Sequence, residues 1–171
     1  SLQAEGAEDS FIRTLSQMQD DLRRDYVTGA YNAVYLNEQY RPIAERAAMS
    51  GTPVGVVMVR VNEYWQLREH ESDSAANCCL NMAAGILQLA VGPDHDKAVL
   101  ARLNDGFFAI VTIGTPAARM AQTVREAMND SRREFNISLS RRGSFTVEIA
   151  SAEWGETASW DMTLSLAQQR L

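Results

Sequence analysis

Hydrophobic positions near the start of the chain follow the spacing of a helix with a single apolar seam. Apolar residues recur in a 4-3-4 pattern between charged residues, at Phe11, Leu15, Met18 and Leu22. Residues 9–24 are therefore expected to form a helix. Two heptads fit a coiled coil with a second chain and equally fit a helix packed on its own domain, so both arrangements stay open. Residues 1–8 are expected to form a linker.

The rest of the chain alternates between helical and strand periodicities. A second helix is expected to bury one face, which carries Leu36, Tyr40, Ile43, Ala44 and Ala47. Val54–Val61 is rich in β-branched residues and almost continuously apolar, which is typical of a central strand buried on both faces. A polar stretch follows over 62–74. Further helices are expected over 76–90, 116–133 and 160–171, and a further strand over 144–151.

A hairpin is predicted where two apolar runs, 98–103 and 107–113, enclose Asn104, Asp105 and Gly106. These three residue types tolerate the positive φ angles of tight turns. Phe107 and Phe108 alternate along the second strand, so one of them is expected to face the core. The order of elements predicts an α/β (α+β) fold of the ferredoxin-like or palm type, with a mostly antiparallel central sheet flanked by helices.

Composition excludes several classes of protein. The formal charge of −6 argues against phosphate-driven binding of nucleic acid or anionic membranes. No apolar run approaches the roughly 18–20 residues that span a bilayer, so direct membrane insertion is not expected. Cys78 and Cys79 are adjacent and are expected to be two small helix residues in a reducing cytoplasm. A cytoplasmic part of a longer, membrane-anchored protein remains open.

The order of elements and several local motifs resemble the GGDEF domain of bacterial diguanylate cyclases, which join two GTP molecules into cyclic dimeric GMP (c-di-GMP). The segment Asp25-Tyr-Val-Thr-Gly-Ala-Tyr-Asn32 is similar to the opening D-x-L-T-G-L-x-N of that family. Residues 102–110, RLNDGFFAI, occupy the place of the signature R-x-G-G-D-E-F-A-I. Residues 60–65, RVNEYW, lie where the family has D-I-D-x-F-K. The resemblance divides the chain into a linker and signalling helix over 1–24 and a GGDEF domain over 25–171.

The same resemblance indicates that the residues needed for cyclase chemistry are missing. Family cyclases hold two divalent cations with an aspartate at the end of the first strand and an acidic residue in the hairpin. Here these positions are Arg60 and Gly106, and the next acidic position is Phe107. Mg²⁺ requires oxygen ligands, so no metal or cofactor is expected. Asp105 is shifted by one residue, which usually points a side chain to the other face.

Nucleotide recognition is eroded in the same comparison. The guanine-reading positions fall on Arg68 and Asn77, and Asn62 and Asn77 remain as candidate weak nucleotide contacts. Arg60 fits two interpretations, direct phosphate binding or a surface pair with a nearby glutamate. The histidines, His70 and His95, are expected to be solvated loop residues. The tryptophans are expected to be packing residues, at Trp65, Trp154 and Trp160.

Three functions follow from these observations. The first is a degenerate, catalytically inactive domain in a c-di-GMP signalling protein, which acts through a homodimer, an upstream sensor or a docked protein partner. The second is a receptor that binds GTP or a related nucleotide without turnover. The third, an active cyclase, is nearly excluded by the lost carboxylates. In the first hypothesis the interface is the seam of Phe11, Leu15, Met18 and Leu22.

Overall fold

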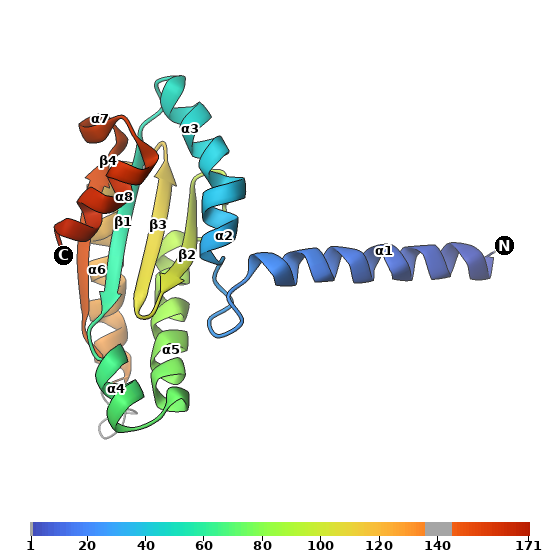
Figure 1. Ribbon diagram of the computed structural model, residues 1–171, viewed down its shortest axis with the longest axis horizontal. Coiled ribbons are helices and arrows are strands. Elements are labelled where there is room, and N and C mark those ends of the chain that lie inside the picture. The colour runs from blue at the N-terminus through green and yellow to red at the C-terminus, as the bar shows by residue number, and fades with distance from the viewer. Residues whose placement is uncertain (1, 136–144) are drawn as a thin grey trace.

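The computed structural model describes residues 2–135 and 145–171, which form a four-stranded sheet with helices on both faces (Figure 1). The N-terminal half contributes α1 (Leu2–Arg23), α2 (Ala33–Tyr35), the π-helical turn η1 (Leu36–Tyr40), α3 (Arg41–Met49), β1 (Val54–Val61) and α4 (Tyr64–His70). The remainder contributes α5 (Asp73–Val91), β2 (Ala98–Asn104), β3 (Phe107–Ile113), α6 (Ala117–Phe135), β4 (Val147–Glu153), α7 (Trp154–Thr157) and α8 (Trp160–Gln169).

The sheet has the strand order β2-β3-β1-β4, and each neighbouring pair is antiparallel. β1 pairs on both sides, and residues 54–59 are all buried. The predicted central strand and the predicted antiparallel α/β fold are therefore confirmed.

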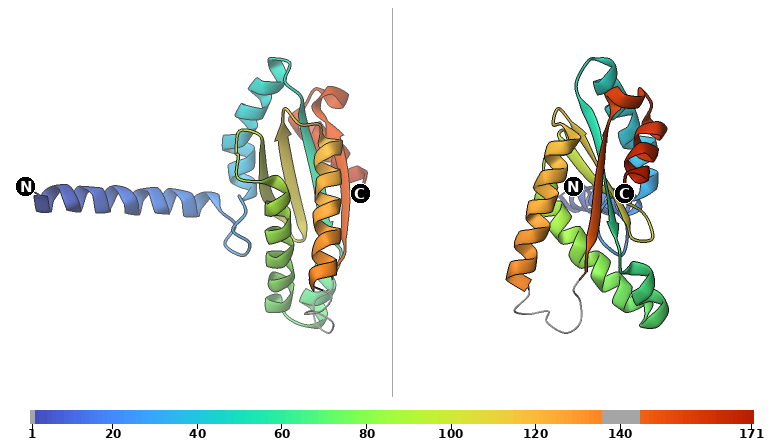
Figure 2. Two further views of the ribbon diagram at one scale, coloured as in Figure 1. Left: turned by 180° about the vertical axis from the view of Figure 1, so that it is seen from behind. Right: turned by 90° about the vertical axis from the view of Figure 1, so that its left-hand side faces the viewer.

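Two apolar layers hold the sheet between its helices. On one face, α5 and α6 pack against the sheet through a cluster that includes Leu80, Leu87, Val124 and Phe108. On the other face, the segment from α2 to α3 and the C-terminal helix α8 cover the sheet through a cluster that includes Leu36, Tyr40, Val56 and Trp160. Both layers are visible in the two views of Figure 2.

The π-helical turn at η1 has a local cause in Pro42. Proline has no amide N–H, so residue 42 cannot donate to a carbonyl in the preceding turn. The helix widens there, and the Arg41 N–H reaches the carbonyl of Leu36 instead. Leu36, Tyr40 and Ala44 are buried, but Ile43 is 41% exposed. The expectation that Ile43 belongs to the buried face was wrong.

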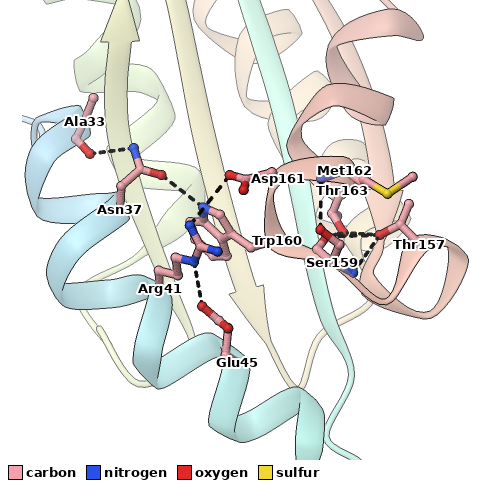
Figure 3. Close-up of polar contacts among 10 residues, drawn as sticks. All are labelled: Ala33, Asn37, Arg41, Glu45, Thr157, Ser159, Trp160, Asp161, Met162 and Thr163. Atoms are coloured by element: carbon pink, nitrogen blue, oxygen red, sulfur yellow. Dashed lines mark hydrogen bonds and ion pairs between the residues drawn. The ribbon is translucent and has the colours of Figure 1, made fainter.

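Segments from opposite ends of the chain meet on this face of the sheet (Figure 3). The indole Nε1 of Trp160 donates a hydrogen bond to Oδ1 of Asn37 at 3.0 Å. Arg41 pairs with Glu45 at 2.6 Å and lies 3.7 Å from Asp161 at the start of α8. Trp160 is thus a packing residue, as predicted, with its one polar atom satisfied.

Three elements differ most from the prediction. α1 begins at Leu2, so residues expected to form a linker continue the helix. The polar stretch over 62–74 contains α4, which was missed because Tyr64 is its only buried residue. β4 runs over Val147–Glu153, two residues beyond the predicted end, and the expected start at residue 144 lies outside the described residues.

α5 carries the two cysteines and is otherwise largely apolar. Cys79 is buried and Cys78 is exposed, and both are free, in line with the prediction. Burial, with the nearby charge of Glu63, raises the pKa of the Cys79 thiol to about 12. Among the described helices, α5 is the one long and apolar enough to span a membrane. Leu80 and Leu87 nevertheless place one of its faces in the core.

Candidate functional site

The β2–β3 hairpin turns at Asp105 and Gly106, between two directly paired residues, Asn104 and Phe107. Asp105 takes the left-handed conformation with φ of 47°, which aspartate tolerates better than most residues. The Gly106 carbonyl accepts a hydrogen bond from the Val61 N–H at 2.8 Å. The predicted hairpin is confirmed, and its tip is anchored to the end of β1.

Gly106 is required by this close approach. A Cβ atom there would lie 2.9 Å from the Val61 carbonyl oxygen and 2.9 Å from Cβ of Tyr64. Real Cβ atoms essentially never come so close, and neither neighbouring atom is the end of a flexible side chain. Any larger residue at position 106 therefore requires the hairpin or β1 to move.

The two phenylalanines after the turn point to opposite faces. Phe108 is fully buried in the core, and Phe107 is partly exposed. One of the two therefore faces the core, as predicted. Phe107 lies directly across from Arg60 in the antiparallel register, so the two side chains share a face of the sheet. A phenyl ring thus stands beside Arg60 at the signature hairpin.

Arg60 is engaged by its neighbours. Its Nη2 forms an ion pair and hydrogen bond with Oε2 of Glu148, the residue opposite it on β4. Its Nε lies 3.3 Å from Oδ1 of Asn62. Of the two interpretations of Arg60, the pair with a nearby glutamate is the one that the structure contains.

A second set of hydrogen bonds closes the end of β1 onto the residue that precedes β4. The Asn62 amide Nδ2 donates to the Thr146 hydroxyl at 3.0 Å. The Glu63 carboxylate accepts from the Thr146 N–H at 2.8 Å and from its hydroxyl at 2.6 Å. The polar atoms of Asn62, Glu63 and Thr146 are therefore largely committed to each other.

The remaining candidate nucleotide positions lie on α4 and α5. Arg68 pairs with Asp73 at 3.3 Å, and its guanidinium lies 5.3 Å from the centre of the Trp65 ring. Trp65 is 48% exposed, so the prediction that it is a packing residue was wrong. Asn77 is partly buried on α5.

The donor set around the hairpin does not fit a magnesium site. Arg60 and Phe107 contribute no oxygen ligand, and Gly106 has no room for a side chain. The nearby carboxylates already accept hydrogen bonds: Glu63 from Thr146, Glu148 from Arg60, and Asp105 of the hairpin from Asn104. Within residues 2–135 and 145–171, no group of three or more His, Cys, Asp or Glu residues is placed to hold a metal ion.

A largely buried ion pair links the base of α1 to the hairpin. The Arg102 guanidinium lies 3.2 Å from Oδ1 of Asp25, and its Nε donates to the Asp105 carbonyl at 3.1 Å. Asp25 also accepts from the N–H and the hydroxyl of Thr28. Both charged side chains are close to 90% buried, with exposures of 13% and 14%.

Asn32 joins α1 to α2. Its side-chain Nδ2 and its backbone N–H donate to the carbonyls of Leu22 and Arg23, which are the last turn of α1. Its Oδ1 accepts from the Tyr35 N–H and so caps the start of α2. Asn32 therefore provides hydrogen-bond partners for the last carbonyls of α1 and for a first N–H of α2.

An aromatic group reinforces the same joint. The Arg24 guanidinium lies 4.1 Å from the centre of the Tyr31 ring, which stacks on Tyr35 with centroids 4.0 Å apart. The Tyr31 hydroxyl lies 3.0 Å from Nδ1 of His95, and the Tyr40 hydroxyl donates to the His95 carbonyl at 3.1 Å. His95 is exposed in the turn before β2, as predicted, and it also contacts the Tyr31 hydroxyl.

The seam of α1 is free of the domain. Figure 1 shows α1 projecting away from the sheet and its helices. Its apolar residues are largely exposed: Phe11 64%, Leu15 44%, Met18 57% and Leu22 79%. Of the two arrangements left open by the sequence, packing on its own domain is not the one adopted.

The family described as "Diguanylate cyclase, GGDEF domain" matches residues 22–171. The chain is similar to the coiled coil and GGDEF domain of DgcB from Caulobacter crescentus, solved in complex with c-di-GMP, with 18% identity and a TM-score of 0.78 over 98% of this chain and 88% of that one. It is also similar to the GGDEF domain of FimX from Pseudomonas aeruginosa, with 23% identity and a TM-score of 0.70 over 86% and 90%.

A third similar structure is the diguanylate cyclase SiaD in complex with its activator SiaC, from Pseudomonas aeruginosa. Its identity is 18% and its TM-score 0.67, over 99% of this chain and 67% of that one. Sequence identities this low establish only that the folds are alike. The family match, however, covers residues 22–171. The chain belongs to the GGDEF-domain family of diguanylate cyclases.

Proposed function

We propose that this chain is a non-catalytic GGDEF domain that acts as a dimerising regulatory module in a c-di-GMP signalling protein. The observation that carries the proposal is the pair of Arg60 with Glu148 at the end of β1. In the family resemblance, that end of the strand holds the aspartate that binds the cations.

The electrostatics of this position oppose cation binding. A guanidinium stays positively charged at any pH a protein tolerates, so it repels a divalent cation at its side. It also engages the one carboxylate directly opposite, Glu148. Without bound cations, nothing neutralises a triphosphate or activates the 3′-hydroxyl that attacks it.

The proposal predicts no detectable c-di-GMP when the purified chain is incubated with GTP and Mg²⁺. Chromatography of the reaction mixture makes the measurement, with an active cyclase of the family as the positive control. A product peak that grows with time and protein concentration would contradict the proposal.

Restoring the family side chains is expected to fail as well. The variant Arg60→Asp, Gly106→Asp, Phe107→Glu supplies three carboxylates, but the Cβ at position 106 still meets Val61 and Tyr64 at 2.9 Å. The variant Arg60→Asp with Phe107→Glu is the matched control without that collision. We expect neither to form product, and the triple variant to unfold at the lower temperature. Equal melting temperatures would show that position 106 has the room we deny it.

The exposed seam of α1 supports the dimeric part of the proposal. Burying large apolar side chains stabilises association by roughly 25 cal/mol for each Å² of apolar surface. A second copy of the same helix presents the same heptad pattern, and a two-stranded coiled coil buries both seams at once. The match to DgcB covers 98% of this chain, and the DgcB structure includes a coiled coil together with its GGDEF domain.

Leu15→Asp with Leu22→Asp is expected to convert the dimer to a monomer, because two carboxylates would enter the seam. Arg13→Asp changes the net charge by the same −2 on the same helix, outside the 4-3-4 seam, and should leave the dimer intact. Analytical ultracentrifugation measures both. A monomeric unmutated chain at high concentration would contradict dimerisation and leave a docked protein, as in the SiaD–SiaC complex, as the regulatory contact.

Nucleotide binding without turnover is the second candidate, and Asn77 is the observation in its favour. Within the described chain its amide makes no side-chain hydrogen bond, whereas Asn62 is committed to Thr146 and Arg60. Calorimetry with GTP and with c-di-GMP, each with and without Mg²⁺, tests it. Saturable binding that Asn77→Ala weakens and Asn62→Ala does not would establish this function.

A further inference from the structure

The outer edge of β4 is unpaired by any described strand. β4 is the last strand in the order β2-β3-β1-β4, and its one partner there is β1. In the right-hand view of Figure 2, β4 faces the viewer along its length, with α6 on one side and α8 on the other. An exposed strand edge is a template for adding another strand.

The register identifies which backbone groups point outward. The Asn62 N–H donates to the Thr146 carbonyl, so this pair is hydrogen-bonded across β1 and β4. In an antiparallel ladder such pairs alternate with pairs whose backbone groups face away. Val147, Ile149, Ser151 and Glu153 therefore turn their N–H and C=O groups toward the open edge.

Two arginines cover the central outward carbonyls. Arg170, which follows α8, donates from Nη1 to the Ser151 carbonyl at 2.8 Å. Arg125, from α6, donates from Nη2 to the Ile149 carbonyl at 3.4 Å. Glu156 holds the Arg170 guanidinium at 2.6 Å. The edge thus carries charged side chains from both layers of the domain, which is one way that proteins block edge pairing.

We propose that the outer edge of β4 is a strand-addition site for β4 of a second copy, and that Arg125 and Arg170 hold it closed. This inference concerns a different surface from α1 and does not rest on the proposed function. Each arginine occupies a carbonyl that an incoming N–H would need. Each also places a charge where the incoming strand would lie.

The sequence of β4 favours a second copy as the added strand. An antiparallel pair centred on Ala150 places each Ile149 opposite a Ser151 and each Val147 opposite a Glu153. No like charges are then directly opposed. Centring on Glu148 would place two carboxylates together, which destabilises a pair. Registers centred on Ile149 or Ser151 also oppose no like charges, and the register centred on Ala150 aligns the outward groups of residue 149 in each copy with those of residue 151 in the other.

Arg125→Ala with Arg170→Ala is the central test. All variants also carry Leu15→Asp and Leu22→Asp, so that pairing through α1 does not contribute. We expect self-association to tighten by at least about tenfold, measured by analytical ultracentrifugation. The control Arg46→Ala with Lys97→Ala removes the same charge from two exposed positions, on α3 and just before β2 at the opposite edge of the sheet, and should leave association unchanged.

Adding Ser151→Pro to the double variant tests whether the edge itself pairs. The Ser151 N–H points outward, so proline removes a donor from the edge and none from the β1 ladder. We expect the tighter association to be lost, and hydrogen exchange at Ile149 and Ser151 to be slowed only in the variant without proline. Circular dichroism checks folding, and Arg170→Ala alone is the milder variant if the pair unfolds.

Two results would overturn the proposal. One is a folded double variant that associates no more tightly than the control pair. The other is tighter association that survives Ser151→Pro, because the copies would then meet elsewhere. Neither result bears on c-di-GMP synthesis or on α1, since the seam of α1 is disrupted throughout.

Discussion

Two arginine–carboxylate pairs lie at ends of the sheet, and they differ in burial. Arg102 and Asp25 are 13% and 14% exposed, and they join the base of α1 to the hairpin with help from Thr28 and the Asp105 carbonyl. Arg60 and Glu148 are 37% and 43% exposed on two neighbouring strands. The first pair fixes the hairpin against the base of α1, and the second lies at the end of β1, where the sequence resemblance places the family's cation ligand.

The difference separates the pair that holds the fold together from the pair that, in the proposed function, prevents cation binding. Removing one partner of a buried pair leaves an uncompensated charge, whereas an exposed pair contributes little. A substitution at position 60 is therefore expected to cost little stability, whatever it does to cation binding under the proposed function. Substitutions at Asp25 or Arg102 cannot be tolerated so easily, because the hairpin and α1 both depend on them.

The largest expected effect belongs to Asp25→Ala. It leaves the Arg102 guanidinium buried without a carboxylate and removes two hydrogen bonds from Thr28. We expect a loss of about 3 kcal/mol in the free energy of unfolding, measured by urea denaturation. A loss below about 1 kcal/mol, the range of an exposed pair, would show that the two pairs do not differ in kind.

Glu148→Ala is expected to have a smaller effect, below about 1 kcal/mol. The Arg60 side chain is partly exposed and keeps its contact with Asn62. Raising the salt concentration should reduce the difference between the variant and the unmutated chain, since exposed ion pairs are screened. A cost that is large and independent of salt would place this pair with Asp25 and Arg102 as one that holds the fold together.

The smallest expected effect concerns a third arginine–carboxylate pair, Arg170 with Glu156, and it is a change in the pKa of Glu156. The hydrogen bond from Arg170 holds the pKa of the Glu156 carboxyl below its ordinary value of 4.5. The associated stability is therefore present above pH 4.5 and is lost as the pH falls through the lowered pKa. In Arg170→Ala, Glu156 should titrate at higher pH by NMR. An unchanged titration would mean that the two groups do not interact in solution.

The elements best predicted from sequence are those whose pattern is local. Val54–Val61 reads as a buried strand because its apolar run is continuous, and Asn104-Asp105-Gly106 reads as a turn because of its residue types. α4 was missed because one buried residue in seven leaves no periodic signal. The π-helical turn before Pro42 was not predicted because the apolar spacing from Leu36 to Ala47 indicates one regular helix.

The contacts of the site were harder to predict than its residues. The motif identifies the position of Arg60 but not its partner. Glu148 is 88 residues away in sequence, and the pairing of β1 with β4 brings the two together. The contact of His95 with Tyr31 likewise spans 64 residues. The sequence could not predict that α1 projects from the domain, since its seam fits both a coiled coil with a second chain and packing on its own domain.

The capped joint at Asn32 has a mechanical consequence. α1 has 22 residues, so it is a rod of about 33 Å. A tilt of roughly 5° at its base would move its far end by about 3 Å, while residues near Asn32 barely shift. Small tilts about Asn32 are therefore amplified toward the N-terminal end of α1. A label at Glu5 would report angular changes that are too small to detect beside the sheet.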